Sequence, residues 1–169
     1  MFWGSFSGSL KGPGFIWEKD WGSINATLYQ EYTVPIIHGW LRLNPTLILM
    51  QDGAPGHKAG ETIQELNERG IYPIFWPAYS PDLNPIETVW NRMKDYIMRK
   101  YPNYHSSYDK LRTAVKEAWD VIEADELPTL VREMPERCQA VIDAEDTQGI
   151  SNKESKALSL CGAYKSNIL

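Results

Sequence analysis

The feature that most constrains the fold is an unbroken apolar run at residues 47–50, followed at once by Asp52 and Gly53. The run has no alternation of apolar and polar residues, which is typical of a β-strand that is covered on both faces. A strand of this kind needs helices on both sides of its sheet. The sequence therefore predicts an α/β fold with a strand over residues 46–50.

The flanking segments predict the neighbours of this strand. Residues 57–69 have helical periodicity and end at Gly70, which suits the position after a helix, and residues 71–75 predict another strand. Strand, helix and strand in this order predict a βαβ unit with two parallel strands and a right-handed crossover. Residues 2–6 and 14–17 are short, aromatic and separated by turn residues, so they predict two antiparallel strands.

Apolar residues at intervals of three to four predict further helices. A helix over residues 25–40 is expected to kink or split at Pro35. Ser106 and Asp109 are a candidate capping box for one of the later helices, and Pro135 is expected to divide the last two. The later helices are predicted over residues 86–97, 107–122, 127–134 and 136–143. No period remains beyond Thr147, so the sequence predicts one domain over residues 1–146 and a disordered tail over 147–169.

Charge and composition limit the functional classes. The net charge of −5 argues against a nucleic-acid binder when the whole chain is considered. However, residues 85–116 hold 7 basic and 3 acidic residues, and residues 117–146 hold 2 basic and 10 acidic ones. This distribution predicts that a helix in the basic stretch faces a polynucleotide and that the acidic stretch backs this helix as a solvated cover. The alternative is ordinary surface charge. Two cysteines without metal-ligand spacing indicate reduced thiols in an intracellular compartment.

Two carboxylates stand out by position. Asp52 follows the buried strand, where open α/β sheets bind ligands, and Glu87 lies in the first turn of the helix after the next strand. Carboxylates placed in this way can bind Mg²⁺, and two such ions about 4 Å apart support phosphodiester displacement. The alternatives are structural, because Asp52 with Gly53 is a common turn pair and Glu87 could cap the helix with Asn84.

Other conspicuous side chains are interpreted as structural. His57 is interpreted as a polar residue at the start of a helix, without a catalytic role. Large aromatic side chains are core anchors more often than platforms for stacked bases, and this interpretation applies to Trp76, Trp90 and Trp119.

Two longer segments carry a family resemblance. MQDGAPGHKA over residues 50–59 and WPAYSPDLNPIETVW over residues 76–90 closely resemble the DDE catalytic domain of the Tc/mariner transposases. Between Asp52 and Glu87 lie 34 residues, which is the spacing of the Tc branch, whose third acid is Glu. FWGSF over residues 2–6 resembles the second strand of the family, and MPERCQAVI over residues 134–142 resembles its closing helix. The resemblance covers residues 1 to about 146.

The resemblance implies a ribonuclease-H-like mixed sheet flanked by helices, here lacking the first strand and carrying extra C-terminal helices. Loss of that strand is expected to expose a β edge and part of the core. The implied activity is DNA cleavage and strand transfer by phosphoryl transfer that depends on Mg²⁺ or Mn²⁺. Asp52 and Glu87 are the implied catalytic residues and metal ligands. Because the first Asp of the family lies on the missing strand, we expect weak metal binding and little or no cleavage.

The resemblance also implies partners. These are DNA, as transposon ends and target DNA, and a homodimer, with localisation in the nucleus. No membrane is expected as a partner, because the longest aliphatic run, residues 47–50, is far too short to span a bilayer. Basic residues are the candidate phosphate contacts, namely Lys58, Arg92, Lys94, Arg99 and Lys100. Two other classes of function stay open. One is a non-catalytic remnant or domesticated module that binds nucleic acid or protein, and the other is a glycoside hydrolase with two carboxylates.

Overall fold

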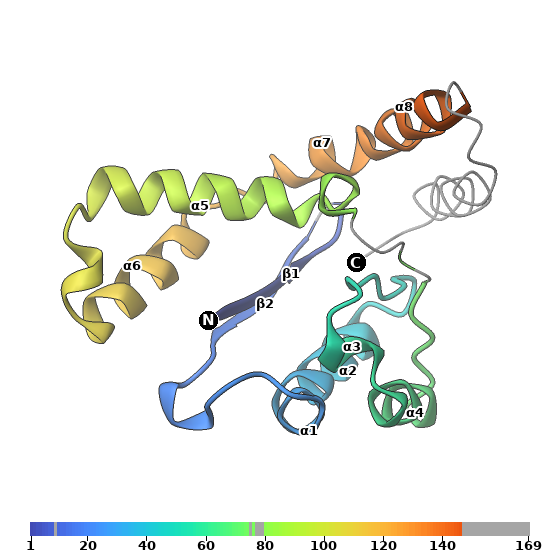
Figure 1. The fold of residues 1–169 in the computed structure, drawn as a ribbon, viewed down its shortest axis with the longest axis horizontal. Helices are drawn as coiled ribbons and strands as arrows, with labels where there is room; N and C mark the ends of the chain where they lie inside the picture. The colour runs from blue at the N-terminus through green and yellow to red at the C-terminus, as the bar shows by residue number, and fades with distance from the viewer. Residues whose placement is uncertain (9, 75, 77–79, 147–169) are drawn as a thin grey trace.

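The computed structural model describes residues 1–8, 10–74, 76 and 80–146 (Figure 1). Two antiparallel strands, β1 (Phe2–Phe6) and β2 (Lys11–Ile16), lie between two groups of helices. The strand register pairs Phe2 with Ile16 and Gly4 with Gly14. The second strand begins three residues earlier than predicted and contains Pro13, which β2 tolerates because it is an edge strand.

The first helical group begins with the short turn η1 (Lys19–Trp21) and a longer helical segment. This segment consists of α1 (Ala26–Leu28), the π-helical turn η2 (Tyr29–Thr33) and α2 (Val34–Leu43). The side chain of Asn25 caps the segment by accepting a hydrogen bond from Leu28 N–H at 2.9 Å. The π-helical turn ends at Thr33, two residues before Pro35, which has no N–H to donate. The helix type changes at Val34, next to Pro35, and the segment continues to Leu43 without the split that the sequence predicted as one outcome.

The predicted helix over residues 57–69 forms as two helices. These are α3 (Pro55–Lys58) and α4 (Gly60–Glu68), separated by the extended backbone of Ala59. Gly70 has a φ of +73°, which favours glycine and ends the second helix as predicted. One face of α4 is buried, through Thr62 and Leu66.

The predicted βαβ unit does not form a regular sheet in the described residues, whose sheet consists of β1 and β2 alone. Residues 46–50 and 71–74 lie side by side, joined by a hydrogen bond from Ile74 N–H to Leu49 C=O at 3.0 Å. Pro73 has no N–H for a ladder, and a cavity lies between residue 49 and β1. The prediction of burial is confirmed at Leu49 and Ile71, each 6% exposed.

The second helical group covers the other face of the hairpin. Its elements are η3 (Pro81–Leu83), α5 (Ile86–Lys100), η4 (Tyr104–Ser106), α6 (Tyr108–Asp120), α7 (Leu127–Arg132) and α8 (Met134–Asp146). Ser107, and not Ser106, caps α6, because its hydroxyl accepts a hydrogen bond from Lys110 N–H at 3.2 Å. The last two helices divide at Glu133, two residues before the predicted Pro135.

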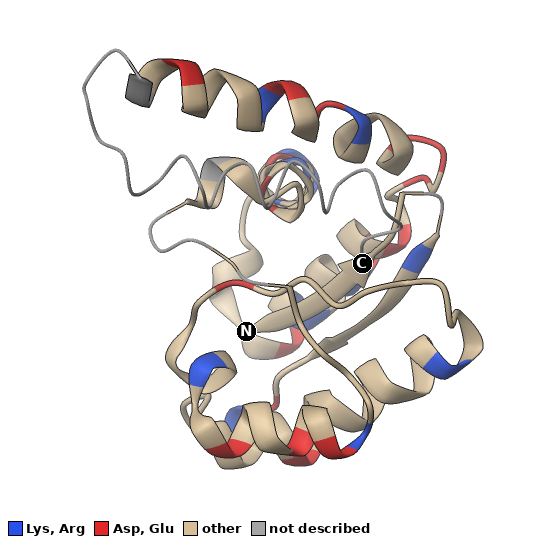
Figure 2. Cartoon of the chain, turned by 90° about the vertical axis from the view of Figure 1, so that its right-hand side faces the viewer, with Lys and Arg blue, Asp and Glu red and all other residues tan. Residues whose placement is uncertain are grey.

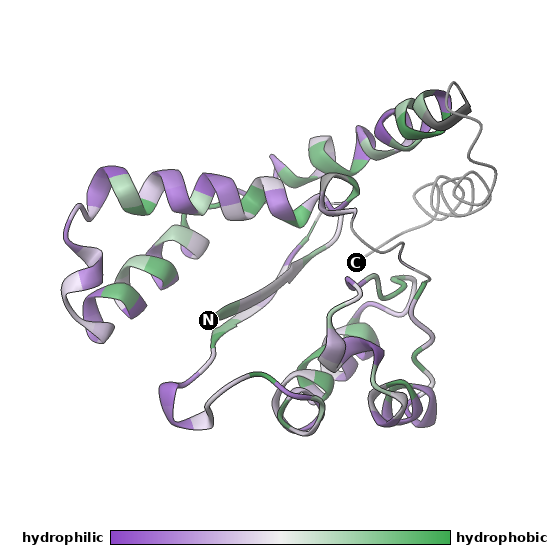
Figure 3. Cartoon of the chain, in the orientation of Figure 1, coloured by the Kyte–Doolittle hydropathy of each residue, from purple (hydrophilic) through white to green (hydrophobic). Residues whose placement is uncertain are grey.

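Aromatic residues join the hairpin to both helical groups. Phe2 packs against Trp90 of α5 and Trp119 of α6, with ring centroids 5.7 and 5.3 Å apart. Trp3, the next residue, packs against the core of the first helical group. Figure 3 shows apolar stripes on α5 and α6. Trp119 and Trp76 are buried and Trp90 is half-buried, so the interpretation of all three as core residues is confirmed.

The described helices are all too short or too polar to cross a bilayer. The described residues end at 146, the last residue of α8, so the predicted domain boundary there stays a prediction. The predicted tail over residues 147–169 lies outside the described residues.

Candidate functional site

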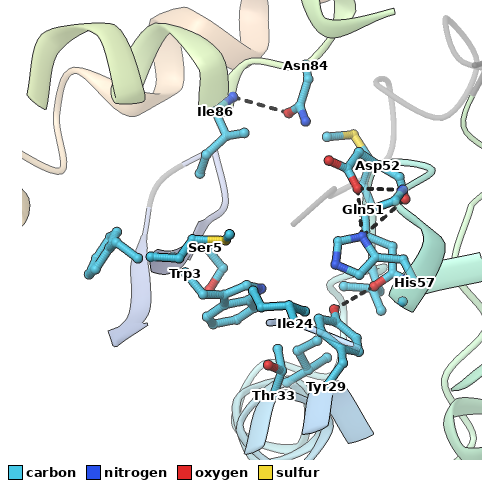
Figure 4. A pocket seen from close by; sticks show the side chains of 18 of the residues that line it. Trp3, Ser5, Ile24, Tyr29, Thr33, Gln51, Asp52, His57, Asn84 and Ile86 are labelled. Atoms are coloured by element: carbon cyan, nitrogen blue, oxygen red, sulfur yellow. Dashed lines mark hydrogen bonds and ion pairs between the residues drawn. The ribbon is translucent and has the colours of Figure 1, made fainter. Parts of the chain in front are cut away.

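A cavity of about 410 Å³ separates β1 from residues 49–57 (Figure 4). Residues of β1 line one wall, and residues 49–52 and 54–57 line the opposite wall. Residues 84–86, which lead into α5, also line the cavity. Among its lining residues, Asp52 supplies the sole carboxylate side chain. The cavity is therefore largely apolar and has one anionic end.

Asp52 is fixed by its own loop. Its Oδ1 accepts a hydrogen bond from Ala54 N–H at 3.0 Å and lies 2.6 Å from Nδ1 of His57. The hydrogen bond from His57 is the main cause that lowers the pKa of Asp52, while partial burial opposes it. Asp52 is therefore ionised at neutral pH, and its half-exposed side chain is accessible to a cation.

A second network fixes the residue before Asp52. The buried Tyr29 donates a hydrogen bond from its hydroxyl to Oε1 of Gln51 at 2.9 Å. Burial, and secondarily the charge of Asp52, raises the pKa of Tyr29, so the hydroxyl remains a donor. The ring of His57 lies 4.4 Å from the ring of Tyr29. Sequence analysis missed Tyr29 and Gln51, because residues 22 positions apart leave no local signal of their contact.

Glu87 lies at the start of α5, beside the cavity-lining residues 84–86. Asn84 is buried, and its Oδ1 accepts a hydrogen bond from Ile86 N–H at 3.3 Å. The Glu87 side chain makes no hydrogen bond or ion pair with any described residue, so it does not complete a capping box with Asn84. Figure 4 shows Asn84 and Asp52 at the same end of the cavity.

The donor set fits part of a divalent-metal site. No group of three His, Cys, Asp or Glu side chains in the described part of the chain could hold a metal ion. Mg²⁺ is commonly held by one or two carboxylates, with water and substrate phosphates as its other ligands. Asp52 and Glu87 carry carboxylate oxygens of this type, on the loop after residue 50 and at the start of α5.

The predicted basic contacts do not form one patch. Lys58 is on α3 and the other four are on α5, where Lys94 lies about 200° around the helix from Arg92. Arg92 pairs with Glu126 and Lys100 pairs with Glu117. Figure 2 shows blue and red residues interspersed over the helices.

The remaining basic side chains of α5 are less engaged. Arg99 Nε donates to the carbonyl of Asp95 in its own helix at 3.2 Å. Lys94 is exposed and makes no side-chain hydrogen bond or ion pair with the residues described here. The pairs made by Arg92 and Lys100 agree with the alternative of ordinary surface charge.

Comparison with known proteins gives the family. Residues 18–112, more than half of the chain, match the DDE superfamily endonuclease family, and the chain belongs to it. It is 32% identical over 147 residues to the Tcb1 transposase of Caenorhabditis briggsae and 29% identical over 147 residues to the Tc1 transposase of Caenorhabditis elegans. Each alignment covers 85% of this chain and 51% of the relative, so the chain spans about half the length of these relatives.

Comparison with solved structures agrees with this family assignment. The catalytic domain of Mos1 transposase, solved with Raltegravir and Mg, superposes with a TM-score of 0.57 at 21% identity. The superposition covers 68% of this chain and 60% of that one. The predicted ribonuclease-H-like fold and the predicted relation to the Tc/mariner transposases are both confirmed.

Proposed function

We propose that this chain is part of a Tc-type DDE transposase catalytic domain, and that Asp52 and Glu87 are two of its metal ligands. The observation that carries the proposal is the shared cavity, which Asp52 lines from one side and the start of α5, next to Glu87, lines from another. Membership of the DDE endonuclease family supports phosphoryl transfer on DNA as the reaction class. The same membership gives no support to a glycoside hydrolase.

Each residue of the site has a role that follows from its contacts. His57 keeps Asp52 ionised and oriented, and the bond from Tyr29 to Gln51 holds the preceding residue in place. The carboxylate of Glu87, which has no side-chain partner among the described residues, can turn toward a cation. When bound, Mg²⁺ or Mn²⁺ would supply Lewis-acid activation of a phosphodiester.

The polypeptide of residues 1–169 is expected to bind these ions weakly and to cleave DNA poorly. Asp52 and Glu87 are two of the three acids that the family resemblance implies, and the described residues place no third acid with them. Weak binding follows because two carboxylates leave more ligand positions to water than three do.

DNA is the proposed partner, as transposon ends and target DNA. Of the five predicted contacts, Lys58, Lys94 and Arg99 have no acidic side-chain partner in the described chain, so they are the more available phosphate contacts. Arg92 and Lys100 would contact phosphate only after leaving Glu126 and Glu117. A homodimer and nuclear localisation accompany this proposal as properties of the transposase class.

The second candidate is a non-catalytic module that binds nucleic acid or protein. The lack of a cluster of three metal-ligating side chains in the described residues favours it. Under this candidate, Asp52→Asn with Glu87→Gln would leave the biological activity unchanged. Under the first candidate the double variant would abolish it.

A Mn²⁺ titration tests the proposed metal site. Paramagnetic broadening of backbone NMR signals is expected first around residues 52–54 and 86–88. Asp52→Asn and Glu87→Gln should each weaken Mn²⁺ binding about tenfold or more, because each removes an anionic ligand. Asp20→Asn, in η1 and not among the cavity-lining residues, is the matched control and should change nothing. Broadening elsewhere, or binding that survives both site variants, would contradict this placement.

A further inference from the structure

The side chain of Lys58 folds back over the turn that follows Asp52. Lys58 ends the single helical turn α3, and its N–H donates to Ala54 C=O at 3.1 Å. A Cβ added to Gly53 would lie 2.4 Å from both Cε and Nζ of Lys58, and the third nearest atom is Cδ of the same side chain. The ammonium of Lys58 therefore lies against Gly53, directly beside the residue proposed as a metal ligand.

The lack of a side chain at residue 53 serves this contact and not the backbone. The glycines with positive φ in the described chain are Gly22 and Gly70, so Gly53 does not have the left-handed backbone that favours glycine. A Cβ at residue 53 would nevertheless come closer to the ammonium than non-bonded atoms do. Since the ammonium is the far end of a flexible side chain, an added methyl group would displace it and leave the backbone in place.

Lys58 is a cation without a fixed partner. The residue is exposed, and its side chain forms no ion pair or hydrogen bond with any residue of the described chain. Asp52 has other partners, since its Oδ1 accepts from Ala54 N–H and lies 2.6 Å from Nδ1 of His57. The hydrogen bond from His57 is the main cause of the lowered pKa of Asp52, and the charge of Lys58 adds to it. The ammonium thus acts on Asp52 through space and keeps its hydrogen-bond donors for another ligand.

The ammonium of Lys58 is placed outside the cavity. Neither Gly53 nor Lys58 belongs to the residues that line it, although Asp52 does. The side chain of Asp52 is 53% exposed, and Lys58 is exposed too. A group that meets both side chains would therefore approach from the solvent side of the loop, whatever fills the cavity between this loop and β1.

The charges beside Gly53 favour an anionic ligand. With a divalent ion on Asp52, the ammonium of Lys58 would face a second cation, and like charges repel each other unless an anion lies between them. A phosphodiester is such an anion, because its oxygens can bind a metal ion and accept hydrogen bonds from an ammonium at the same time. Lysine binds phosphate as a compact point charge with three donors. The arrangement therefore suits an ion with a bound phosphate better than the ion alone.

We propose that Lys58 binds the phosphodiester group on which the chain acts, and that Gly53 is the positioning residue that gives its ammonium access to that group. The inference rests on the proposed metal site at Asp52. It goes beyond that site because it separates Lys58 from the basic residues of α5. Those residues would contact phosphates along the DNA, whereas Lys58 contacts the phosphate held beside Asp52.

The test measures how residues 1–169 bind the dinucleotide thymidylyl-thymidine, which has a single phosphodiester, in the presence of Mn²⁺. Paramagnetic broadening of its phosphorus NMR signal reports a phosphate next to the ion. Lys58→Gln should weaken dinucleotide binding about tenfold, because a charge-assisted hydrogen bond is lost. Without the dinucleotide, the same variant should bind Mn²⁺ about twofold more tightly, because a repelling charge is removed.

Gly53→Ala keeps the charge of Lys58 and displaces the ammonium, so it should also weaken dinucleotide binding several-fold. The double variant Gly53→Ala with Lys58→Gln should bind no more weakly than Lys58→Gln alone, because Gly53 acts through Lys58. Matched controls are Lys116→Gln, at an exposed lysine of α6, and Gly39→Ala on α2, where an added Cβ meets no atom within 4 Å. Neither control should change the binding of the dinucleotide or of Mn²⁺.

The outcomes separate this inference from the proposed function. A wild-type chain that binds no Mn²⁺ at Asp52 would overturn the metal site and the inference with it. Mn²⁺ binding that depends on Asp52, together with unchanged dinucleotide binding in Lys58→Gln, would overturn the role of Lys58 alone. Losses that add in the double variant would instead indicate backbone damage at Gly53, and an equal loss in Lys116→Gln would indicate an effect of net charge. Either result would contradict the proposal.

Discussion

At the scale of single residues, the local chemistry of the candidate site depends on the pair formed by Asp52 and His57. The Nδ1 atom of His57 lies 2.6 Å from Oδ1 of Asp52, and Ala54 N–H donates to the same oxygen. One carboxylate oxygen is thus engaged by the protein, which leaves the other oriented for a ligand. This arrangement supports the proposed role of Asp52 as a cation ligand.

The His57→Ala variant should raise the pKa of Asp52 toward its ordinary value, since the main cause that lowers it is removed. A lowered pKa in the folded state stabilises the protein above the ordinary Asp pKa, and this stabilisation is lost as the pH falls through the lowered value. The loss should be roughly 0.5 kcal/mol in the wild type, because the pair is partly exposed, and smaller in the variant. NMR titration of the Asp52 carboxyl and urea unfolding between pH 6 and 3 measure both effects.

The control for this experiment is His105→Ala, which removes an exposed imidazole that is distant in sequence and does not line the cavity. It should leave the pKa of Asp52 unchanged. An unshifted Asp52 titration in His57→Ala would mean that the loop backbone, and not the imidazole, sets the ionisation.

At the scale of elements, the helices are stabilised by the packing of their apolar faces more than by intrinsic helix propensity. The short helix α4 contributes Leu66, 0% exposed, to a core with Tyr29, Val34, Ile37 and Leu49. This core supports the wall of the cavity that carries residues 49–57. Damage to α4 is therefore expected to loosen the site as well as the fold.

Leu66→Ala should lower the free energy of unfolding by about 2–5 kcal/mol, because it leaves a cavity in the core. Leu43→Ala makes the same chemical change at a side chain that belongs to an 82% exposed residue, and its effect should stay within about 0.5 kcal/mol. Urea denaturation followed by tryptophan fluorescence measures both. Equal effects of the two variants would refute the described packing of α4.

At the scale of the whole molecule, acidic and basic side chains from segments far apart in the sequence form ion pairs. Glu117 on α6 accepts hydrogen bonds from Tyr101, Lys100 and Tyr96 around the end of α5. The bond from Lys100 is the main cause that lowers the pKa of Glu117 to about 2, and the partnership raises the pKa of Lys100. The acidic stretch of the sequence therefore neutralises part of the basic stretch instead of only covering it.

The double variant Glu117→Gln with Glu126→Gln should raise the affinity for duplex DNA several-fold at low salt, because it releases Lys100 and Arg92. The matched control is Glu123→Gln with Asp125→Asn, which removes the same charge from exposed residues. Fluorescence anisotropy at several salt concentrations should show a steeper salt dependence for the first pair. Equal changes in both pairs would mean that net charge alone controls binding.

The sequence could predict much of this protein because several of its signals are local. Helical periodicity located α5 and α6, Gly70 marked a helix end, and the absence of alternation at residues 47–50 indicated burial. The motifs that contain Asp52 and Glu87 gave the family, because their residue types and spacing are specific. A member of this family can be recognised without coordinates for that reason.

The tertiary structure alone decided how these pieces meet. Among the described residues, 46–50 and 71–74 do not form regular strands as predicted, because strand pairing depends on a neighbour that the local sequence does not contain. The pairs of Arg92 and Lys100 with acidic residues and the bond from Tyr29 to Gln51 join segments far apart in the chain. The cavity beside β1 is likewise lined by distant segments. Local patterns determine which face of an element is apolar. Contacts across the fold determine which other element that face packs against.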